Sequence, residues 1–204
     1  MDKAGSGQTG SGQTGSAATK PTSSTEFARR ILAIRRARPS CGAVTVVAID
    51  GGAASGKTTL AAALAQQFVA SATVHTDDLL NGWADQFGFW SRLREQVLRP
   101  LAAGRAGHYQ RYDWNLGRFQ NEFVTVPVVP TLFVEGVSAI EACASWSSYG
   151  VFIDVSRQDR ELHWRRRDGE LGDEARRWLD REDEYFASRS ITADWVVQRG
   201  DSLP

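Results

Sequence analysis

The feature that most constrains this chain is an eight-residue run, Gly-Gly-Ala-Ala-Ser-Gly-Lys-Thr, that spans residues 51–58. The stretch before it, residues 44–50, is short, apolar and β-branched, which is typical of a parallel strand buried on both faces. The stretch after it, residues 57–69, is rich in Ala and Leu and predicts a helix. A strand, a glycine-rich loop and a helix in this order predict a phosphate-binding loop, because small residues let the backbone approach an anion and the helix N-terminus presents N–H groups to it.

The same loop predicts which cofactors the chain binds. Lys57 adds a positive charge suited to the β- and γ-phosphates of ATP, and the hydroxyl of Thr58 can ligate Mg²⁺. We therefore expect ATP and Mg²⁺ as cofactors. The residues expected to bind the nucleotide are those of the loop and the start of the helix: Gly51, Gly52, Ala53, Ala54, Ser55, Gly56, Lys57, Thr58 and Thr59.

Carboxylates follow two further predicted strands. Glu135 comes directly after the apolar residues 131–134, and Asp77 and Asp78 follow a short strand that ends at His75. Nucleotide-bound Mg²⁺ keeps several waters and takes one or two carboxylates from the protein, so Glu135 and Asp77 are candidate metal partners beside Thr58. The alternatives are a solvated strand-end carboxylate for Glu135 and a helix N-cap for the Asp pair.

The rest of the chain alternates between predicted strands and helices, which implies crossover connections and a mostly parallel sheet. We expect an α/β P-loop fold with a five-stranded sheet and helices on both faces. One domain, residues 25–204, would follow a disordered Gly/Ser/Gln/Thr-rich tail, residues 1–24. Residues 107–130 fit the alternation least well and predict an irregular or hairpin segment over the carboxyl ends of the strands, where such sheets place ligands.

Composition restricts the classes of partner. The formal net charge is zero, which argues against a dedicated nucleic-acid binder, and no apolar run approaches the roughly 20 residues of a membrane-spanning helix. Cys41 and Cys143 lack metal-site spacing and are expected to be reduced, and the N-terminus lacks a secretory pattern, so we expect a cytoplasmic protein. An arginine-rich amphipathic helix is predicted to end before Pro39; its arginines either form a solvated face or contact an anionic partner.

Taken in order, these motifs resemble the uridine kinase and phosphoribulokinase group of P-loop kinases over about residues 44–197. The resemblance lies in Ile49-Asp50-Gly51-Gly52 entering the loop, His75-Thr76-Asp77-Asp78, Tyr112-Asp113-Trp114, Val134-Glu135-Gly136 and the arginine-rich stretch Arg160 to Asp168.

The resemblance implies roles for several residues. Asp77 would be the general base on the acceptor hydroxyl, Glu135 would be a magnesium partner, and Tyr112 and Asp85 would contact the acceptor. A lid would span about residues 157–172. The lid would supply cations from Arg160 and Arg167 to the transferred phosphoryl group, unless these arginines form a solvated or salt-bridged face with Glu161 and Asp168.

One position departs from the family pattern. Family members that act on pyrimidine nucleosides carry a base-reading His after the Tyr-Asp-Phe element, where ungapped alignment places Gly117 here. We therefore expect an ATP-dependent kinase acting on a small-molecule hydroxyl without strict uridine or cytidine selectivity. The alternatives are a nucleotide-hydrolysing switch, although the chain has no Asn-Lys-x-Asp guanine element, and a nucleic-acid-associated ATPase. The sequence leaves homo-oligomer formation open.

Overall fold

The computed structural model describes residues 23–198. Residues 1–22, which hold most of the predicted tail, and residues 199–204 lie outside the described residues. Helix α1 begins at Ser23, so the last two residues assigned to the tail belong to this helix.

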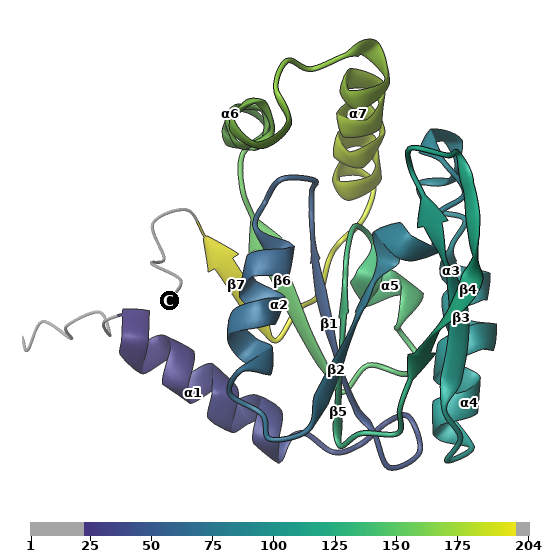
Figure 1. Ribbon diagram of the computed structural model, residues 1–204. Coiled ribbons are helices and arrows are strands. Elements are labelled where there is room, and N and C mark those ends of the chain that lie inside the picture. The colour runs from purple at the N-terminus through teal and green to yellow at the C-terminus, as the bar shows by residue number, and fades with distance from the viewer. Residues whose placement is uncertain (1–22, 199–204) are drawn as a thin grey trace, which may run out of the picture.

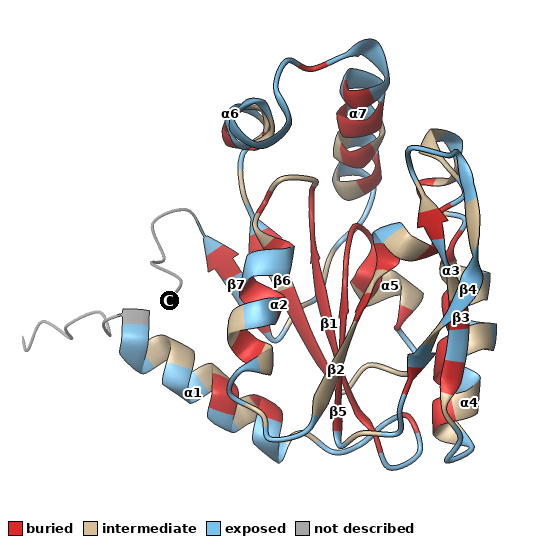
Figure 2. Ribbon diagram, viewed as in Figure 1, coloured by how far each residue is buried: buried red, intermediate tan, exposed pale blue. Residues whose placement is uncertain are grey.

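A five-stranded sheet forms the centre of the molecule (Figure 1). Its strands are β1 (Thr45–Gly51), β2 (Ser71–His75), β5 (Thr131–Glu135), β6 (Tyr149–Asp154) and β7 (Trp195–Gln198). They lie in the order β2-β5-β1-β6-β7, and every neighbouring pair is parallel. The predicted parallel five-stranded sheet is confirmed. All seven residues of β1 are buried, as the apolar character of that stretch predicted, and Figure 2 shows buried residues along the central strands.

Helices cover both faces of this sheet. One face packs against α1 (Ser23–Arg36) and α2 (Lys57–Ala65), and alternate residues of β1 such as Val47 and Ile49 point to it. The other face packs against α5 (Ala139–Ala142) and a continuous helical segment made of α3 (Trp90–Leu93), the π-helical turn η3 (Arg94–Leu98) and α4 (Arg99–Ala102). Val46 and Ala48 of β1 belong to this second core.

The segment that fitted the strand–helix alternation least well is an antiparallel hairpin, β3 (Gly107–Asp113) paired with β4 (Arg118–Val126). It does not lie over the strand ends as predicted. It stands beside the sheet along α3 and α4, and only its tip reaches the level of the carboxyl ends (Figure 1). The reason is that the hairpin has its own apolar side: Tyr109 and Val126 are buried in the core that contains η3 and α4.

Two helices lie beyond the carboxyl ends of the strands, at the top of Figure 1. They are α6 (Arg157–Asp168), whose N-cap Ser156 accepts a hydrogen bond from the Asp159 N–H, and α7 (Asp173–Ala187). Two short 3-10 turns, η1 (Thr76–Leu79) and η2 (Trp83–Asp85), follow β2 toward the same end.

The remaining predictions on composition concern cysteines and membranes. Cys41 and Cys143 are free thiols and both are buried. None of the helices within residues 23–198 has the length and apolar character required to cross a membrane.

Candidate functional site

A cavity of about 910 Å³ opens at the carboxyl ends of the sheet. Its walls come from the phosphate loop, from η1 and the end of β5, from η2 and the hairpin tip, and from α6 and α7. The lining residues are Ala53, Ala54, Ser55, Gly56, Lys57, Thr58, Thr59, Asp77, Trp83, Trp114, Glu135, Val137, His163, Trp164, Arg167, Asp168 and Trp178. Most of the predicted nucleotide-binding residues therefore face one space, whereas Gly51 and Gly52 lie in the loop behind it.

The phosphate loop joins β1 to α2 in the bend that the motif requires. Ala54 has a left-handed φ of 59°, a conformation that costs a non-glycine residue about 1–3 kcal/mol and persists only where the surroundings hold it. The hydroxyl of Ser55 is buried and has no hydrogen-bond partner among residues 23–198, and Lys57 Nζ donates to the Gly52 carbonyl at 2.8 Å. A buried hydroxyl, a lysine and the first N–H groups of a nine-residue helix are the donors that a triphosphate needs.

Glu135 lies at the end of β5 beside this loop. Thr58 Oγ1 donates to its Oε1 at 2.9 Å, and His75 Nδ1 lies 2.6 Å from the same oxygen. Burial disfavours ionisation of Glu135, but the hydrogen bond with His75 and the charge of Lys57 outweigh it and lower the pKa of the carboxyl group. Glu135 is thus an ionised, anchored carboxylate and not the solvated one of the alternative interpretation.

Asp77 lies in η1 and opens into the cavity. Protein surrounds it on the other sides, and this desolvation raises the pKa of its carboxyl group although the charge of Lys57 acts to lower it. Its neighbour Asp78 turns away from the cavity, where Tyr109 Oη donates to Asp78 Oδ2 at 3.1 Å and Arg111 Nε lies at the same distance. Neither aspartate is the N-cap of η1, because His75 holds that position.

These groups fit a magnesium ion that arrives with the nucleotide. The described residues contain no cluster of three or more His, Cys, Asp or Glu side chains placed to hold a metal by themselves. Mg²⁺ on a nucleotide needs only one or two protein oxygens, since phosphates and waters supply the rest. The Thr58 hydroxyl and the ionised Glu135 carboxylate lie side by side and meet that requirement.

Gly136, directly after Glu135, permits close packing between the end of β5 and η1. A Cβ at position 136 would lie 1.7 Å from Thr76 Oγ1, so its absence lets η1 pack against the end of β5. This close packing brings Asp77 to the same cavity as Glu135.

The two lid arginines have different surroundings. Arg167 lines the cavity, lies 5.7 Å above the ring of Trp164 and pairs with Asp168 at 2.6 Å. Arg160 does not line the cavity and is buried, with Nη1 2.7 Å from Glu182 Oε2 and Nη2 paired with Asp183. The prediction that Arg160 supplies a free cation to the phosphoryl group does not match this placement, because two carboxylates of α7 already take up its charge.

The two expected acceptor residues also lie outside the cavity lining. Asp85 pairs with Arg92 and accepts a hydrogen bond from the Asn81 N–H at 2.8 Å, so its carboxylate fixes the loop around η2. Tyr112 is buried in the hairpin, with its ring 5.2 Å from Trp114 and 5.3 Å from Phe119. Tyr112 therefore supports the hairpin tip, and the neighbouring Trp114 is the residue that reaches the cavity.

Sequence reasoning missed an aromatic wall made by four tryptophans. Trp83, from η2, lies at its centre, with ring centroids 5.3 Å from Trp114, 6.5 Å from Trp164 and 5.5 Å from Trp178. The four rings come from η2, the hairpin tip, α6 and α7. The only signal in the sequence was the count of seven tryptophans in 204 residues.

Two buried carboxylates were also missed. Asp50, at the end of β1, accepts hydrogen bonds from the N–H groups of Gly51, Ser138 and Ile140 at 2.7 to 3.1 Å. Burial, opposed by these bonds and by the Lys57 charge, raises the pKa of Asp50 to about 6. Glu182, on α7, is fully buried and accepts a hydrogen bond from the Ala53 N–H of the phosphate loop.

Comparison with known proteins shows which of them share this architecture. Neither protein-family sequence profiles nor curated protein sequences match the chain. Among solved structures, a candidate uridine kinase from Bacillus stearothermophilus matches with a TM-score of 0.56 at 22% identity, over 86% of this chain and 97% of that one.

Two further solved structures give the same result. A candidate fructose transport system kinase from Silicibacter sp. TM1040 has a TM-score of 0.54 at 18% identity, over 87% of this chain and 99% of the other. D-glycerate 3-kinase from Cryptococcus neoformans var. grubii has a TM-score of 0.50 at 17% identity, over 88% and 96%. The chain therefore has the fold of the P-loop kinases, as the resemblance of its motifs predicted.

Proposed function

We propose that the protein is a Mg²⁺- and ATP-dependent kinase that transfers the γ-phosphoryl group to a hydroxyl of a small molecule. The observation that carries this proposal is that Asp77 opens into the same cavity as Lys57 and Thr58. A nucleotide switch needs no site for an acceptor, whereas a kinase needs a carboxylate beside the phosphates and space for the acceptor hydroxyl. The cavity has both.

Each side chain has a defined task in this reaction. When bound, ATP supplies the phosphoryl group and Mg²⁺ supplies a counter-charge, with Thr58 and Glu135 as its protein partners. Lys57 neutralises charge on the phosphates, and Arg167 faces the same space from α6. Asp77 orients the acceptor hydroxyl and accepts its proton. Phosphoryl transfer requires little beyond this positioning and charge neutralisation.

The raised pKa of Asp77 suits a proton acceptor. A carboxylate with an ordinary pKa near 4 is a weak base, and the desolvation that raises the pKa of Asp77 increases its basicity. Its neighbour Asp78 is occupied by Tyr109 and Arg111 and does not compete for this task.

The tryptophan wall suggests the chemistry of the acceptor. Trp83, Trp114 and Trp178 line the cavity and offer flat apolar faces with few hydrogen-bonding groups. Trp178 in addition has its indole N–H engaged with Glu182. We therefore propose an acceptor that presents one hydroxyl to Asp77 and packs a flat or apolar body against the rings. Gly117, in the position of the base-reading His, is exposed in the hairpin tip and offers no side chain for selectivity among nucleosides.

The structural neighbours support a kinase and leave the acceptor open. Their names refer to uridine, to a fructose transport system and to D-glycerate, which share a hydroxyl group and little else. The acceptor proposed here is a small molecule and not a nucleic acid.

A ligand screen tests this proposal. Candidate alcohols are added to the protein with Mg²⁺ and a non-hydrolysable ATP analogue, and thermal unfolding is followed. A true ligand at about 100 times its dissociation constant adds about 2.7 kcal/mol of stability. We expect stabilisation by the nucleotide analogue and further stabilisation by alcohols with a flat body, with nucleic acid having no effect. Stabilisation by nucleotide alone, with ADP release independent of every alcohol, would favour the nucleotide-hydrolysing switch.

A further inference from the structure

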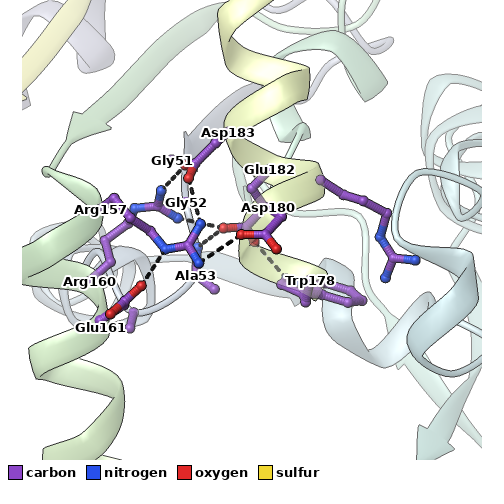
Figure 3. Close-up of polar contacts among 12 residues, drawn as sticks. Gly51, Gly52, Ala53, Arg157, Arg160, Glu161, Trp178, Asp180, Glu182 and Asp183 are labelled. Atoms are coloured by element: carbon purple, nitrogen blue, oxygen red, sulfur yellow. Dashed lines mark hydrogen bonds and ion pairs between the residues drawn. The ribbon is translucent and has the colours of Figure 1, made fainter. Parts of the chain in front are cut away.

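Glu182 of α7 is a fully buried carboxylate that lies between the phosphate loop and the lid (Figure 3). Its Oε2 accepts a hydrogen bond from the Ala53 N–H at 2.9 Å and from Arg160 Nη1 at 2.7 Å. Its Oε1 accepts from Trp178 Nε1 at 2.6 Å. One side chain therefore joins the phosphate loop, α6 and the aromatic wall of the cavity.

A carboxylate so close to a triphosphate site would repel the nucleotide unless its charge were neutralised. Arg160 supplies the positive charge, and it lies against the backbone of the loop: a Cβ at position 52 would lie 2.3 Å from Arg160 Nη1. Gly52 therefore leaves open the space that the Arg160 side chain occupies. A buried Arg–Glu pair is costly to break by removing one partner, because the remaining charge is then buried and unpaired.

The phosphate loop needs a support of this kind. Ala54 adopts a left-handed φ, which is unfavourable for any residue with a Cβ. Ala54 and its neighbour Ala53 are held from outside the loop: Glu182 accepts from the Ala53 N–H, and His163 Nδ1 donates to the Ala54 carbonyl at 3.1 Å. Both supporting residues come from helices α6 and α7, which belong to the lid end of the molecule.

We propose that Glu182 is a positioning residue that holds the phosphate loop in its nucleotide-binding bend through Ala53. Through Trp178 the same carboxylate fixes the wall against which the acceptor packs. Glu182 touches neither nucleotide nor acceptor. This inference rests on the proposed function, because it assumes that the loop binds ATP.

The substitution that tests it is Glu182→Gln. The amide keeps the size of the side chain, but it places an N–H₂ group against donors and leaves Arg160 without its buried counter-charge. We expect the dissociation constant for ATP, measured by calorimetry in the absence of acceptor, to rise about 10- to 100-fold, the effect of losing a hydrogen bond to a charged group. At saturating ATP, kcat should change far less than KM for ATP.

Two acidic neighbours provide matched controls. Asp183 forms ion pairs with Arg160 and Arg157, and Asp180 forms one with Arg157 from an exposed position; among the described residues, neither carboxylate bonds the phosphate loop as Glu182 does. Asp183→Asn should weaken ATP binding less than Glu182→Gln, and Asp180→Asn should leave it unchanged. Equal losses in Glu182→Gln and Asp183→Asn would show that the carboxylates merely anchor α7, and would overturn the proposal.

A rescue experiment separates positioning from general stability. Glycine adopts positive φ without the penalty of a Cβ, so Ala54→Gly should make the bend less dependent on its supports. In the Glu182→Gln background it should restore ATP affinity by several-fold without restoring the melting temperature. Failure of this rescue, with affinity and stability falling together, would also overturn the proposal.

If Glu182→Gln does not fold, Arg160→Lys tests the same contact. Lysine keeps the charge but cannot bond Glu182 and Asp183 in the geometry of a guanidinium. We expect a several-fold rise in KM for ATP with kcat retained, and an unchanged KM would contradict the role of Glu182. Failure of the wild-type protein to bind ATP would instead overturn the proposed function, so the two failures are distinguishable.

Discussion

Two adjacent aspartates, Asp77 and Asp78, have opposite surroundings although they differ by one position in the chain. Asp77 opens into the cavity near Lys57, whereas Asp78 is bonded to Tyr109 and Arg111 of the hairpin. Their contrast provides an internal control for the assignment of the base. A structural carboxylate, Asp78, and the proposed catalytic one, Asp77, can thus be compared within the same short turn.

We expect Asp77→Asn to lower kcat by about 10²- to 10⁴-fold, the usual range for loss of a general base, with KM for ATP nearly unchanged. Asp78→Asn should cost much less, because its carboxylate holds the hairpin and faces no reacting group. Steady-state kinetics of both variants with a productive acceptor measures this difference. The reverse order of effects would assign the base to Asp78.

Asp50 gives a prediction about stability and pH. Burial raises its pKa to about 6 in the folded protein, whereas an unfolded Asp has a pKa near 3.9. A carboxyl group with a raised folded pKa binds its proton more tightly in the folded state, so its contribution to stability is smallest above pH 6 and grows as the pH falls toward 4.

The comparison with Asp50→Asn isolates this contribution, because the amide does not titrate. When the pH falls from 7 to 5, we expect the free energy of unfolding of the wild-type protein to increase by on the order of 1 kcal/mol relative to that of the variant. Chemical denaturation at several pH values measures it. Curves for the two proteins that stay parallel across this range would show that Asp50 keeps an ordinary pKa.

Among the elements, the hairpin contributes to the site in the way that the sequence predicted least well. It stands beside the sheet, and only its tip carries a side chain, Trp114, into the cavity. Trp114 is 40% exposed, so its removal should cost little stability. Its ring contacts Trp83 in the wall proposed to pack against the acceptor.

Trp114→Ala should therefore raise KM for the acceptor by about 10-fold or more, of the order expected when an aromatic contact is lost, and leave KM for ATP unchanged. Leu116→Ala is the matched control, because Leu116 lies in the same turn, is 63% exposed and does not line the cavity. An unchanged acceptor KM in Trp114→Ala would remove the hairpin tip from the acceptor site.

Helix α6, which lies in the predicted lid, shows how far periodicity can predict a site. Arg160 and Arg167 lie seven residues apart, so the helical pattern correctly places them near one face. They are also two turns, about 10 Å, apart along the axis, and they meet different neighbours. Arg167 reaches the cavity, whereas Arg160 reaches Glu182 and Asp183 of α7. No sequence pattern indicates which elements pack against each turn.

For the whole molecule, the sequence predicted the parallel sheet and the phosphate loop because both depend on local patterns. The buried run that became β1 and the glycine-rich loop after it carry their structure in consecutive residues. The tryptophan wall and the Glu182 contact with Ala53 join segments far apart in the chain, so consecutive residues contain no sign of them. The predicted site residues therefore lie closest together where they belong to one motif, and their roles stay predictions.

The central claim is that the phosphate loop and Asp77 together transfer a phosphoryl group to an alcohol. The most direct measurement incubates the protein with ATP labelled in its γ-phosphoryl group, Mg²⁺ and an alcohol selected by the ligand screen, and follows labelled product and ADP together. We predict that labelled alcohol and ADP form in equal amounts, and that a folded Lys57→Ala variant forms neither and binds ATP more weakly. Formation of ADP without labelled alcohol, or unchanged activity in Lys57→Ala, would contradict the claim.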